Sequence, residues 1–234
     1  MTRDFELLVF DWDGTLVDSI TWIVECIERA ARFCKLRLPT AGDSQRVIGL
    51  GLGEAMEVLY PEVSSSTRAR FCTVYSDYFR SREMTPDHLF EGVVEMLGRL
   101  KSRGHKLAVA TGKTRAGLEV ALGSTGIAGF FDSTRCADET ASKPDPLMLC
   151  QLMSELRVSS HDTLMIGDSV HDLRMAQNAR VEAIAVSCGA DGTTRLSELA
   201  PLFVLDHTTD LERVLAHTEI QPHPPRSLGG ELTC

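Results

Sequence analysis

VFDWDGTLVDS, at residues 9–19, is the stretch of sequence that decides the fold. It overlaps a short apolar run at residues 7–10 and places Asp11 and Asp13 directly after that run. Such a run is typical of a buried strand, and open α/β sheets bind their ligands at the carboxyl ends of their strands. Residues two apart on a strand point the same way, so the two carboxylates are predicted to face one pocket.

The sequence beyond this motif alternates between two patterns. Short apolar runs that end in polar or glycine residues predict four more strands, at residues 107–110, 163–166, 183–186 and 203–205. Longer stretches between them have helical spacing of apolar residues, as at Val93, Met96, Leu97 and Leu100. Strands that alternate with helices indicate an α/β fold with a parallel sheet covered on both faces.

One segment, from about residue 19 to 88, breaks this alternation. It shows no central strand, but apolar residues at helical spacing mark one helix at Ile20, Ile23, Val24, Ile27 and Ala31 and another at Phe71, Val74, Tyr75 and Phe79. The segment is therefore predicted to be a helical insertion after the first strand. GLGLG at residues 49–53 lacks the Gly-x-Gly-x-x-Gly spacing and is predicted to be a flexible loop, not a dinucleotide site.

The two aspartates of the first motif suit metal or nucleophilic chemistry. Close carboxylates at a strand end bind a hard cation such as Mg²⁺, and one of them can instead attack an electrophile. The simpler alternative is a polar turn that leaves the strand. A calcium loop is excluded because it needs glycine at its sixth position and glutamate at its twelfth, where this chain has Leu16 and Trp22.

Thr111, Gly112 and Lys113 follow the second predicted strand. A hydroxyl, a flexible backbone and an ammonium are parts of an anion site, and a helix that begins after them would offer free N–H groups to a phosphate. A Walker P-loop is excluded, because its first glycine would fall at Leu107. The alternative is that Thr111 or Thr114 only caps a helix.

Lys143 lies in the segment ASKPDP, where Pro144 and Pro146 stiffen the backbone. Asp145 can cap the helix that Leu147 is predicted to begin. A rigid backbone holds a lysine in one position, whereas most single lysines are solvated surface residues. The choice between these two interpretations depends on what lies near the side chain.

Asp168 follows the apolar run at residues 163–166, and Asp172 lies four residues further on. If Ser169 or Asp168 caps a helix, Asp172 lies one turn along it. A second acidic cluster at the same edge of the sheet would complete a Mg²⁺ site, whereas helix capping alone explains only one of the aspartates. His171, between them, is predicted to be exposed.

Composition argues against some classes of function. The chain has 24 Lys and Arg against 33 Asp and Glu, a net charge of −9 and no basic cluster, so nucleic acid is not an expected partner. No apolar run approaches the length of a signal sequence or a membrane span, so no membrane contact is expected. The seven cysteines lack a Cys-x-x-Cys pair and are predicted to be reduced thiols of a cytoplasmic protein.

Taken in order, DWDGT, Thr111, Lys143 and GDSVHD resemble the four motifs of the haloacid dehalogenase-like hydrolase superfamily. The likeness spans most of residues 5–215. The helical insertion resembles the small cap of the subgroup that contains phosphoglycolate phosphatases and β-phosphoglucomutases.

The resemblance implies a division of the chain into a Rossmann-like sheet core and a cap domain that closes over the substrate. The core would comprise residues 1–17 and 89–217, and the helical cap residues 18–88. QPHPPRSLGG at residues 221–230 has little apolar content, so residues 218–234 are predicted to be a flexible tail.

The same resemblance implies catalytic roles for four residues. Asp11 would attack phosphorus to form an aspartyl-phosphate. Asp13 would protonate the leaving oxygen and later activate water. Thr111 and Lys143 would bind the transferring phosphoryl group, whose spread negative charge makes fixed cations and donors the main source of catalysis.

The resemblance also implies a Mg²⁺ site and a substrate site. The implied Mg²⁺ ligands are Asp11, the backbone carbonyl of Asp13, and Asp168. Asp172 would support the metal site or orient Lys143. Gly14 and Gly112 would contribute to the substrate site, together with Thr111 and Lys143.

The motif residues favour one activity of the superfamily. Dehalogenases do not need the second aspartate of the first motif, so Asp13 favours a phosphatase that acts on a small phosphorylated metabolite. A phosphosugar mutase of the β-phosphoglucomutase type stays open, whereas a non-catalytic binding protein is disfavoured because no catalytic position is replaced. Phosphoglycolate is one implied substrate, although Ile48 and Leu50 lie beside the cap-loop glycines, where phosphoglycolate phosphatases often carry a polar residue.

Overall fold

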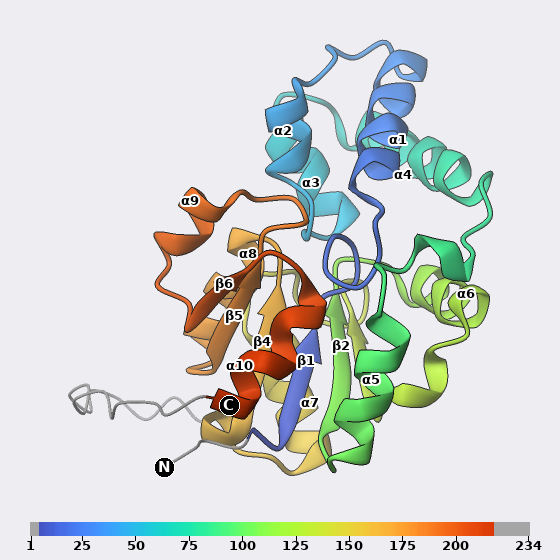
Figure 1. Cartoon of the computed structure of the whole chain (residues 1–234). Coiled ribbons are helices and arrows are strands. Elements are labelled where there is room, and N and C mark those ends of the chain that lie inside the picture. The colour runs from blue at the N-terminus through green and yellow to red at the C-terminus, as the bar shows by residue number, and fades with distance from the viewer. Residues whose placement is uncertain (1–4, 218–234) are drawn as a thin grey trace.

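A six-stranded parallel sheet lies at the centre of the computed structural model, which describes residues 5–217. The strands follow the order β3-β2-β1-β4-β5-β6 (Figure 1). They are β1 (Leu7–Phe10), β2 (Lys106–Thr111), β3 (Ser133–Cys136), β4 (Thr163–Gly167), β5 (Glu182–Val186) and β6 (Phe203–Leu205). Phe10 of β1 lies opposite Val109 of β2 and Ile166 of β4. The strand order therefore reverses at β1, and open α/β sheets bind ligands at such a switch point.

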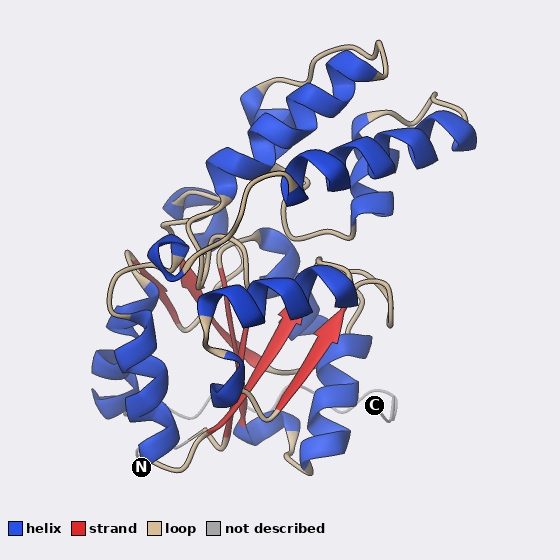
Figure 2. Cartoon of the chain, turned by 90° about the vertical axis from the view of Figure 1, so that its right-hand side faces the viewer, coloured by secondary structure: helices blue, strands red, loops and turns tan. Residues whose placement is uncertain are grey.

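Helices cover both faces of the sheet (Figure 2). Alternate residues of β1 point to opposite faces, and both sets are apolar, so each face packs against helices. Leu8 lies in one buried apolar cluster with Met96, whereas Val9 lies in a second with Leu149. The first face is covered by α5 (Val93–Ser102), α6 (Arg115–Thr125) and α10 (Leu211–His217), and the second by α7 (Leu147–Leu156), α8 (Val170–Asn178) and the short α9 (Thr193–Ser197). Within residues 5–217, no helix combines the length and the apolar character needed to cross a bilayer.

Four helices form the insertion after β1, and they lie beyond the end of the sheet toward which the strand arrows point (Figures 1 and 2). They are α1 (Ile20–Phe33), α2 (Ala41–Gln45), α3 (Leu52–Leu59) and α4 (Ser65–Arg80). Ile27, Met56 and Phe71 belong to a third buried cluster, which joins α1, α3 and α4. The fold class is therefore confirmed: a Rossmann-like parallel sheet carries a small helical cap after its first strand.

The two segments that join the insertion to the sheet run side by side. The Asp18 N–H donates to the His88 carbonyl at 2.8 Å, and the Phe90 N–H donates to the Leu16 carbonyl at 3.0 Å. The segment that leaves the sheet for the insertion is thus hydrogen-bonded to the segment that returns from it. This pairing is consistent with domain limits near residues 17 and 89, although those limits stay a prediction. The predicted tail at residues 218–234 lies outside the described residues.

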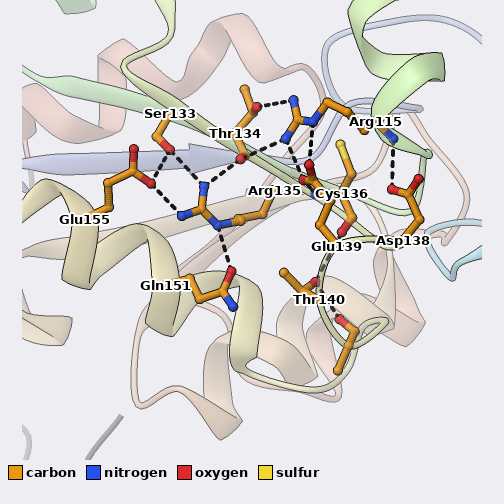
Figure 3. Close-up of polar contacts among 11 residues, drawn as sticks. Arg115, Ser133, Thr134, Arg135, Cys136, Asp138, Glu139, Thr140, Gln151 and Glu155 are labelled. Carbon is orange, nitrogen blue, oxygen red and sulfur yellow. Dashed lines mark hydrogen bonds and ion pairs between the residues drawn. The ribbon is translucent and has the colours of Figure 1, made fainter.

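The edge strand β3 was not predicted from the sequence, whereas the five predicted strands are all present. Its sequence, Ser-Thr-Arg-Cys, has almost no apolar content and gives no strand signal. Polar contacts hold it instead: Arg135 pairs with Glu155 of α7, and Arg115 of α6 binds Thr134 and Glu139 (Figure 3). Charged side chains on an edge strand also discourage pairing with another chain.

The cysteine prediction is confirmed at five positions and wrong at one. The thiols of Cys26, Cys34, Cys72, Cys136 and Cys188 are free. Cys150 is disulfide-bonded. Spacing along the chain did not reveal this, because disulfide connectivity cannot be deduced from sequence alone, and Cys234 lies outside the described residues.

Candidate active site

Asp11 occupies the centre of the site, one residue beyond β1. Its N–H donates to the Ile166 carbonyl at 2.9 Å, which continues the pairing of β1 with β4 and fixes the backbone. The side chain is buried, and its Oδ1 lies 2.7 Å from Nζ of Lys143. The rigid end of a central strand thus holds a carboxylate against a single ammonium.

Lys143 is a buried residue, so the surface alternative is excluded. Its side chain has no exposed area, and Nζ also lies 2.6 Å from Oδ1 of Asp172. The surrounding loop is held at two points: the Asn178 side chain donates to the Pro144 carbonyl, and the Leu147 N–H donates to Asp145, each at 2.9 Å. These contacts stiffen the loop as the proline-rich sequence predicted.

Asp168 follows β4 and is enclosed by backbone that comes very close to it. Its Oδ1 accepts a hydrogen bond from Thr15 Oγ1 at 2.9 Å, and its Oδ2 accepts one from the Ala190 N–H at 2.7 Å. A Cβ atom on Gly14, which has a φ of +78°, would lie 2.2 Å from Oδ2. Glycine at this position therefore lets the DWDGT turn approach the second acidic motif.

The two carboxylate oxygens of Asp172 make different contacts at the start of α8. Its Oδ2 accepts hydrogen bonds from the N–H and the Oγ of Ser169, which closes a capping box, while its Oδ1 faces Lys143. Capping and site formation were alternatives in the sequence, and the structure shows that one carboxylate does both.

Three carboxylates gather within reach of one metal ion. Asp11, Asp168 and Asp172 each offer an oxygen, these atoms lie within 4.8 Å of one another, and all three residues are buried. Burial raises the pKa of Asp11 to about 7 against the opposing attraction of Lys143. Burial, and then the charges of the other two carboxylates, raise the pKa of Asp168 well above its usual range. One ammonium does not balance this charge, so the oxygen cluster fits a hard divalent cation.

Asp13 lies outside that cluster. Its Oδ1 accepts a hydrogen bond from Ser19 Oγ at 2.6 Å, and its Oδ2 lies 3.0 Å from Nζ of Lys113. The Lys113 ammonium also lies 4.4 Å from the ring centre of Phe79, on α4. The carboxylate of Asp13 is thus free of the metal cluster, as an acid and base requires, and the role of its backbone carbonyl stays a prediction.

The Thr111 segment joins the site from the end of β2. Thr111 is buried, and its Oγ1 accepts a hydrogen bond from the Lys113 N–H at 3.2 Å. Thr114 caps α6 through the Gly117 N–H. The capping alternative therefore holds for Thr114, whereas Thr111 lines the same cavity as Asp11 and Asp13.

The cap loop packs directly on the core at this point. The Gly51 N–H donates to Ser142 Oγ at 2.8 Å, and His171 Nε2 lies 2.8 Å from the Arg46 carbonyl, to which it donates. His171 is half-buried by this contact, so the prediction of an exposed histidine is wrong. The structure therefore has the insertion closed against the sheet.

The GLGLG segment is only partly the loop that was predicted. Gly49 and Gly51 precede α3, whereas Gly53 lies within that helix. The loop backbone lies so close to the core that a Cβ atom on Gly112 would be 2.3 Å from the Leu50 carbonyl oxygen. Gly112 thus permits contact with the cap, a function that the anion-site interpretation did not include.

A cavity of about 560 Å³ lies between the sheet and the insertion. Asp11, Asp13, Thr111 and Gly112 line it from the core, and residues of α1, α3 and α4 line it from the cap. Lys143, Asp168 and Asp172 do not line it. Asp11 thus lines the cavity, while the groups that set the charge around its carboxylate are enclosed.

Several residues that contact the site aspartates were not predicted from the sequence. Thr15 and Ser19 hold Asp168 and Asp13, and the Ala190 N–H comes from the loop after β5. Thr15 and Ser19 belong to the first motif, so their polar character was a usable signal. The Ala190 contact uses backbone only, so no residue type could have indicated it.

Comparison with known proteins places the fold and site in context. The sequence model of the haloacid dehalogenase-like hydrolase family matches residues 8–186 of this chain. "Probable phosphatase IndB" of Dickeya dadantii is 35% identical over 86% of this chain and 89% of its own length. "Phosphoglycolate phosphatase" of Vibrio vulnificus strain YJ016 is 28% identical over 89% of this chain and 95% of its own. A hydrolase from Pseudomonas syringae superposes with a TM-score of 0.81 at 21% identity, covering 89% of this chain and 97% of that one.

Proposed function

The chain belongs to the haloacid dehalogenase-like hydrolase family, and we propose that it is a Mg²⁺-dependent phosphatase that cleaves a phosphate monoester through an aspartyl-phosphate on Asp11. One observation carries the proposal. Asp11 lines the cavity at the end of the central strand, and its carboxylate has the Lys143 ammonium 2.7 Å away and two further buried carboxylates beside it.

The first chemical step uses the two aspartates of DWDGT. A carboxylate oxygen of Asp11 forms a bond to phosphorus while the bond between phosphorus and the ester oxygen breaks. The carboxylic acid of Asp13 gives its proton to that leaving oxygen, so an alcohol departs. Lys143 and Thr111 stabilise the charge that develops on the phosphoryl oxygens.

The second step regenerates the enzyme. Asp13, now a carboxylate, takes a proton from a water molecule, whose oxygen bonds to phosphorus as the bond to Asp11 breaks. Inorganic phosphate leaves and Asp13 is again an acid. Ser19 and Lys113 hold the Asp13 side chain through both steps, since each contacts one of its carboxylate oxygens.

Asp11, Asp168 and the backbone carbonyl of Asp13 are the groups that would hold Mg²⁺, and Asp172, the third member of the carboxylate cluster, would support the metal site or orient Lys143. The bound ion supplies positive charge that offsets the phosphoryl oxygens and the carboxylates around them. Thr15 and the Ala190 N–H orient Asp168, and Lys143 together with the Ser169 N–H orients Asp172. This support of ligands by fixed hydrogen bonds is typical of metal sites.

The substrate proposed here is a small phosphorylated metabolite in the cytoplasm. Relatives named for phosphatase, phosphoglycolate phosphatase and pyrophosphatase activity support hydrolysis of a phosphate group. Phosphoglycolate is accordingly one ester that the first assay includes.

The test is release of inorganic phosphate from p-nitrophenyl phosphate and from small esters, with Mg²⁺ and without any bisphosphate activator. We expect multiple turnovers that stop on chelation with EDTA and in Asp11→Asn, whereas Asp87→Asn, the same substitution at an exposed position, keeps wild-type rates. Turnover that survives in Asp11→Asn would contradict the mechanism. Dependence on an added sugar bisphosphate would favour a mutase.

A further inference from the structure

The cavity above Asp11 has a chemical character that a small anionic substrate does not require. Its cap side is built from buried apolar side chains, among them Ile23, Ile27, Val47, Ile48, Met56 and Phe71. Its volume of about 560 Å³ lies in the range of pockets that enclose drug-sized ligands. A two-carbon acid such as glycolate would leave most of this apolar surface unpaired.

Aromatic rings stand at the cap side of the cavity in a stacked arrangement. The rings of Trp22 and Phe79 lie 4.4 Å apart with an angle of 5° between their planes, and Tyr75 lies 6.0 Å from Phe79 at 23°. All three residues line the cavity. Phe79 stacks on Trp22, Arg82 lies over the Trp22 ring and Lys113 over the Phe79 ring, so a bound apolar group would meet the edges of these rings, a packing geometry that aromatic groups favour.

The cations that line the cavity are already engaged. Lys113 pairs with Asp13 at 3.0 Å, and Arg80 pairs with Asp77 at 2.9 Å. Arg82 lies over the ring of Trp22 at 5.1 Å. Both arginines are exposed, so they are not buried among the apolar side chains. Within the described lining, the deep part of the cavity thus offers a substrate carboxylate no counterion, and an unpaired buried charge is strongly unfavourable.

Tyr75 adds one polar group to this surface. Among the described residues its hydroxyl makes no hydrogen bond, although the residue lines the cavity together with Asp13. A phenolic hydroxyl in such a place can donate to one oxygen or nitrogen of a bound molecule. The cavity therefore combines a wide apolar body with a hydrogen-bonding group at Tyr75.

We infer that the preferred substrates are phosphate monoesters whose alcohol part carries an aromatic ring or an apolar body of similar size. The ring packs against the edges of Trp22, Tyr75 and Phe79 and the apolar side chains beside them, while the phosphate faces Asp11. This assignment rests on the proposed phosphatase function and narrows its substrate class. It also sets phosphoglycolate apart as a poor substrate, because its carboxylate would lie in the apolar part.

The test compares esters that differ in the body of the alcohol but not in its reactivity. Ethyl phosphate and 2-phenylethyl phosphate are both esters of primary alcohols, so their leaving oxygens have similar basicity, and 2-phosphoglycolate adds a carboxylate. We expect kcat/KM for 2-phenylethyl phosphate to exceed that for either other ester by roughly 10- to 100-fold, the gain from burying a phenyl group. The full-length protein with Mg²⁺ is used throughout.

A cavity-filling variant adds a second, independent readout. Ala55 lines the cavity from α3, so Ala55→Leu should lower the ratio of kcat/KM for 2-phenylethyl phosphate to that for ethyl phosphate. Ala69→Leu makes the same change at an exposed position of α4 and should keep the wild-type ratio. The ratio does not depend on the fraction of folded enzyme, so partial unfolding cannot imitate the effect.

The outcomes distinguish a failure of the inferred substrate class from a failure of the proposed phosphatase function. Equal or higher kcat/KM for ethyl phosphate or 2-phosphoglycolate would overturn the aromatic assignment and leave a phosphatase. An unchanged ratio in Ala55→Leu would show that the ring does not occupy this cavity. Hydrolysis of none of the esters, p-nitrophenyl phosphate included, would overturn the phosphatase itself.

Discussion

Nζ of Lys143 lies 2.6 Å from Oδ1 of Asp172, and neither side chain has exposed area. The same Nζ lies 2.7 Å from Oδ1 of Asp11. One ammonium thus joins the Asp11 carboxylate to a carboxylate that is itself fixed by Ser169 at the start of α8. Asp172 therefore contacts the Lys143 ammonium and is also part of the acidic cluster, and we propose that it positions Lys143.

Asp172→Asn should lower kcat by about 10- to 100-fold, the usual cost of removing a residue that orients a site group. The amide can still accept the hydrogen bond from the Ser169 N–H, but it no longer attracts Lys143 electrostatically. The measurements are kcat and the Mg²⁺ concentration that gives half-maximal activity. Asp206→Asn, at an exposed position, is the matched control. A kcat equal to wild type would contradict the positioning function.

Mg²⁺ should stabilise the protein more at higher pH. Burial raises the folded pKa of Asp11 from 3.8 to about 7, so the proton bound there stabilises the folded state below that range, and this stability is lost as the pH rises through about 7. Mg²⁺ needs the ionised carboxylates, so it replaces the proton. We expect the Mg²⁺-induced rise in Tm to be larger at about pH 8 than at about pH 5.5.

Thermal melts in EDTA and in Mg²⁺ at the two pH values make this measurement without any substrate. Asp11→Asn removes one titrating group and should reduce the pH dependence of the Mg²⁺ effect. Asp87→Asn, which is exposed, should not. A Mg²⁺-induced shift that is the same at both pH values in the wild type would argue against a metal bound by these carboxylates.

Most of the sheet was predictable because β1, β2, β4 and β5 are buried along nearly their whole length, and β6, at one edge, still has an apolar sequence. β1, β2, β4, β5 and β6 each contain an apolar run that the sequence displays directly. β3 lies at the other edge and is held by the ion pair of Arg135 with Glu155 and by contacts of Arg115, which only the folded chain brings together (Figure 3). Its pairing energy comes from partners distant in sequence, so a local pattern could not reveal it.

The site was predictable to the level of its motif residues but not of its contacts. The end of a strand indicated where Asp11 and Asp168 lie, because parallel strands end at one edge. That Lys113 contacts Asp13, or that Gly112 meets the Leu50 carbonyl, depends on how the cap closes. The sequence does not specify that geometry locally, since the paired residues come from separate elements.

Gly112→Ala should hold the cap away from the core. Its Cβ would lie 2.3 Å from the Leu50 carbonyl oxygen and 2.9 Å from that of Gly49, and both of these are backbone atoms that cannot rotate aside. We expect kcat/KM to fall by about 10- to 100-fold, because a small displacement of binding groups is costly.

Gly53→Ala is the matched control for this substitution. An added Cβ at Gly53 meets nothing within 4 Å, and the residue lies in α3 of the same insertion. It should keep kcat/KM and stabilise the helix slightly, because alanine is the better helix former. Small-angle scattering should show a more extended Gly112→Ala protein. Unchanged kinetics in Gly112→Ala would mean that the loop contact is not needed for turnover.

Asp13→Asn should separate the two chemical steps. The leaving group of p-nitrophenyl phosphate departs without a proton, so Asp11 can still be phosphorylated, but no carboxylate remains to take a proton from water. We expect a burst of about one equivalent of p-nitrophenolate followed by slow turnover, as when an intermediate accumulates. An ester of a primary alcohol, which needs the proton, should give no burst.

Rapid mixing measures the burst, and intact-protein mass spectrometry detects one added phosphoryl group. Asp11→Asn should give neither signal, because the acceptor is gone. The side-chain amide introduced by Asp13→Asn would keep a contact with Ser19, so loss of structure is not the expected cause of slow turnover. Steady turnover without a burst would place the slow step elsewhere and contradict the assignment of Asp13 as the base of the second step.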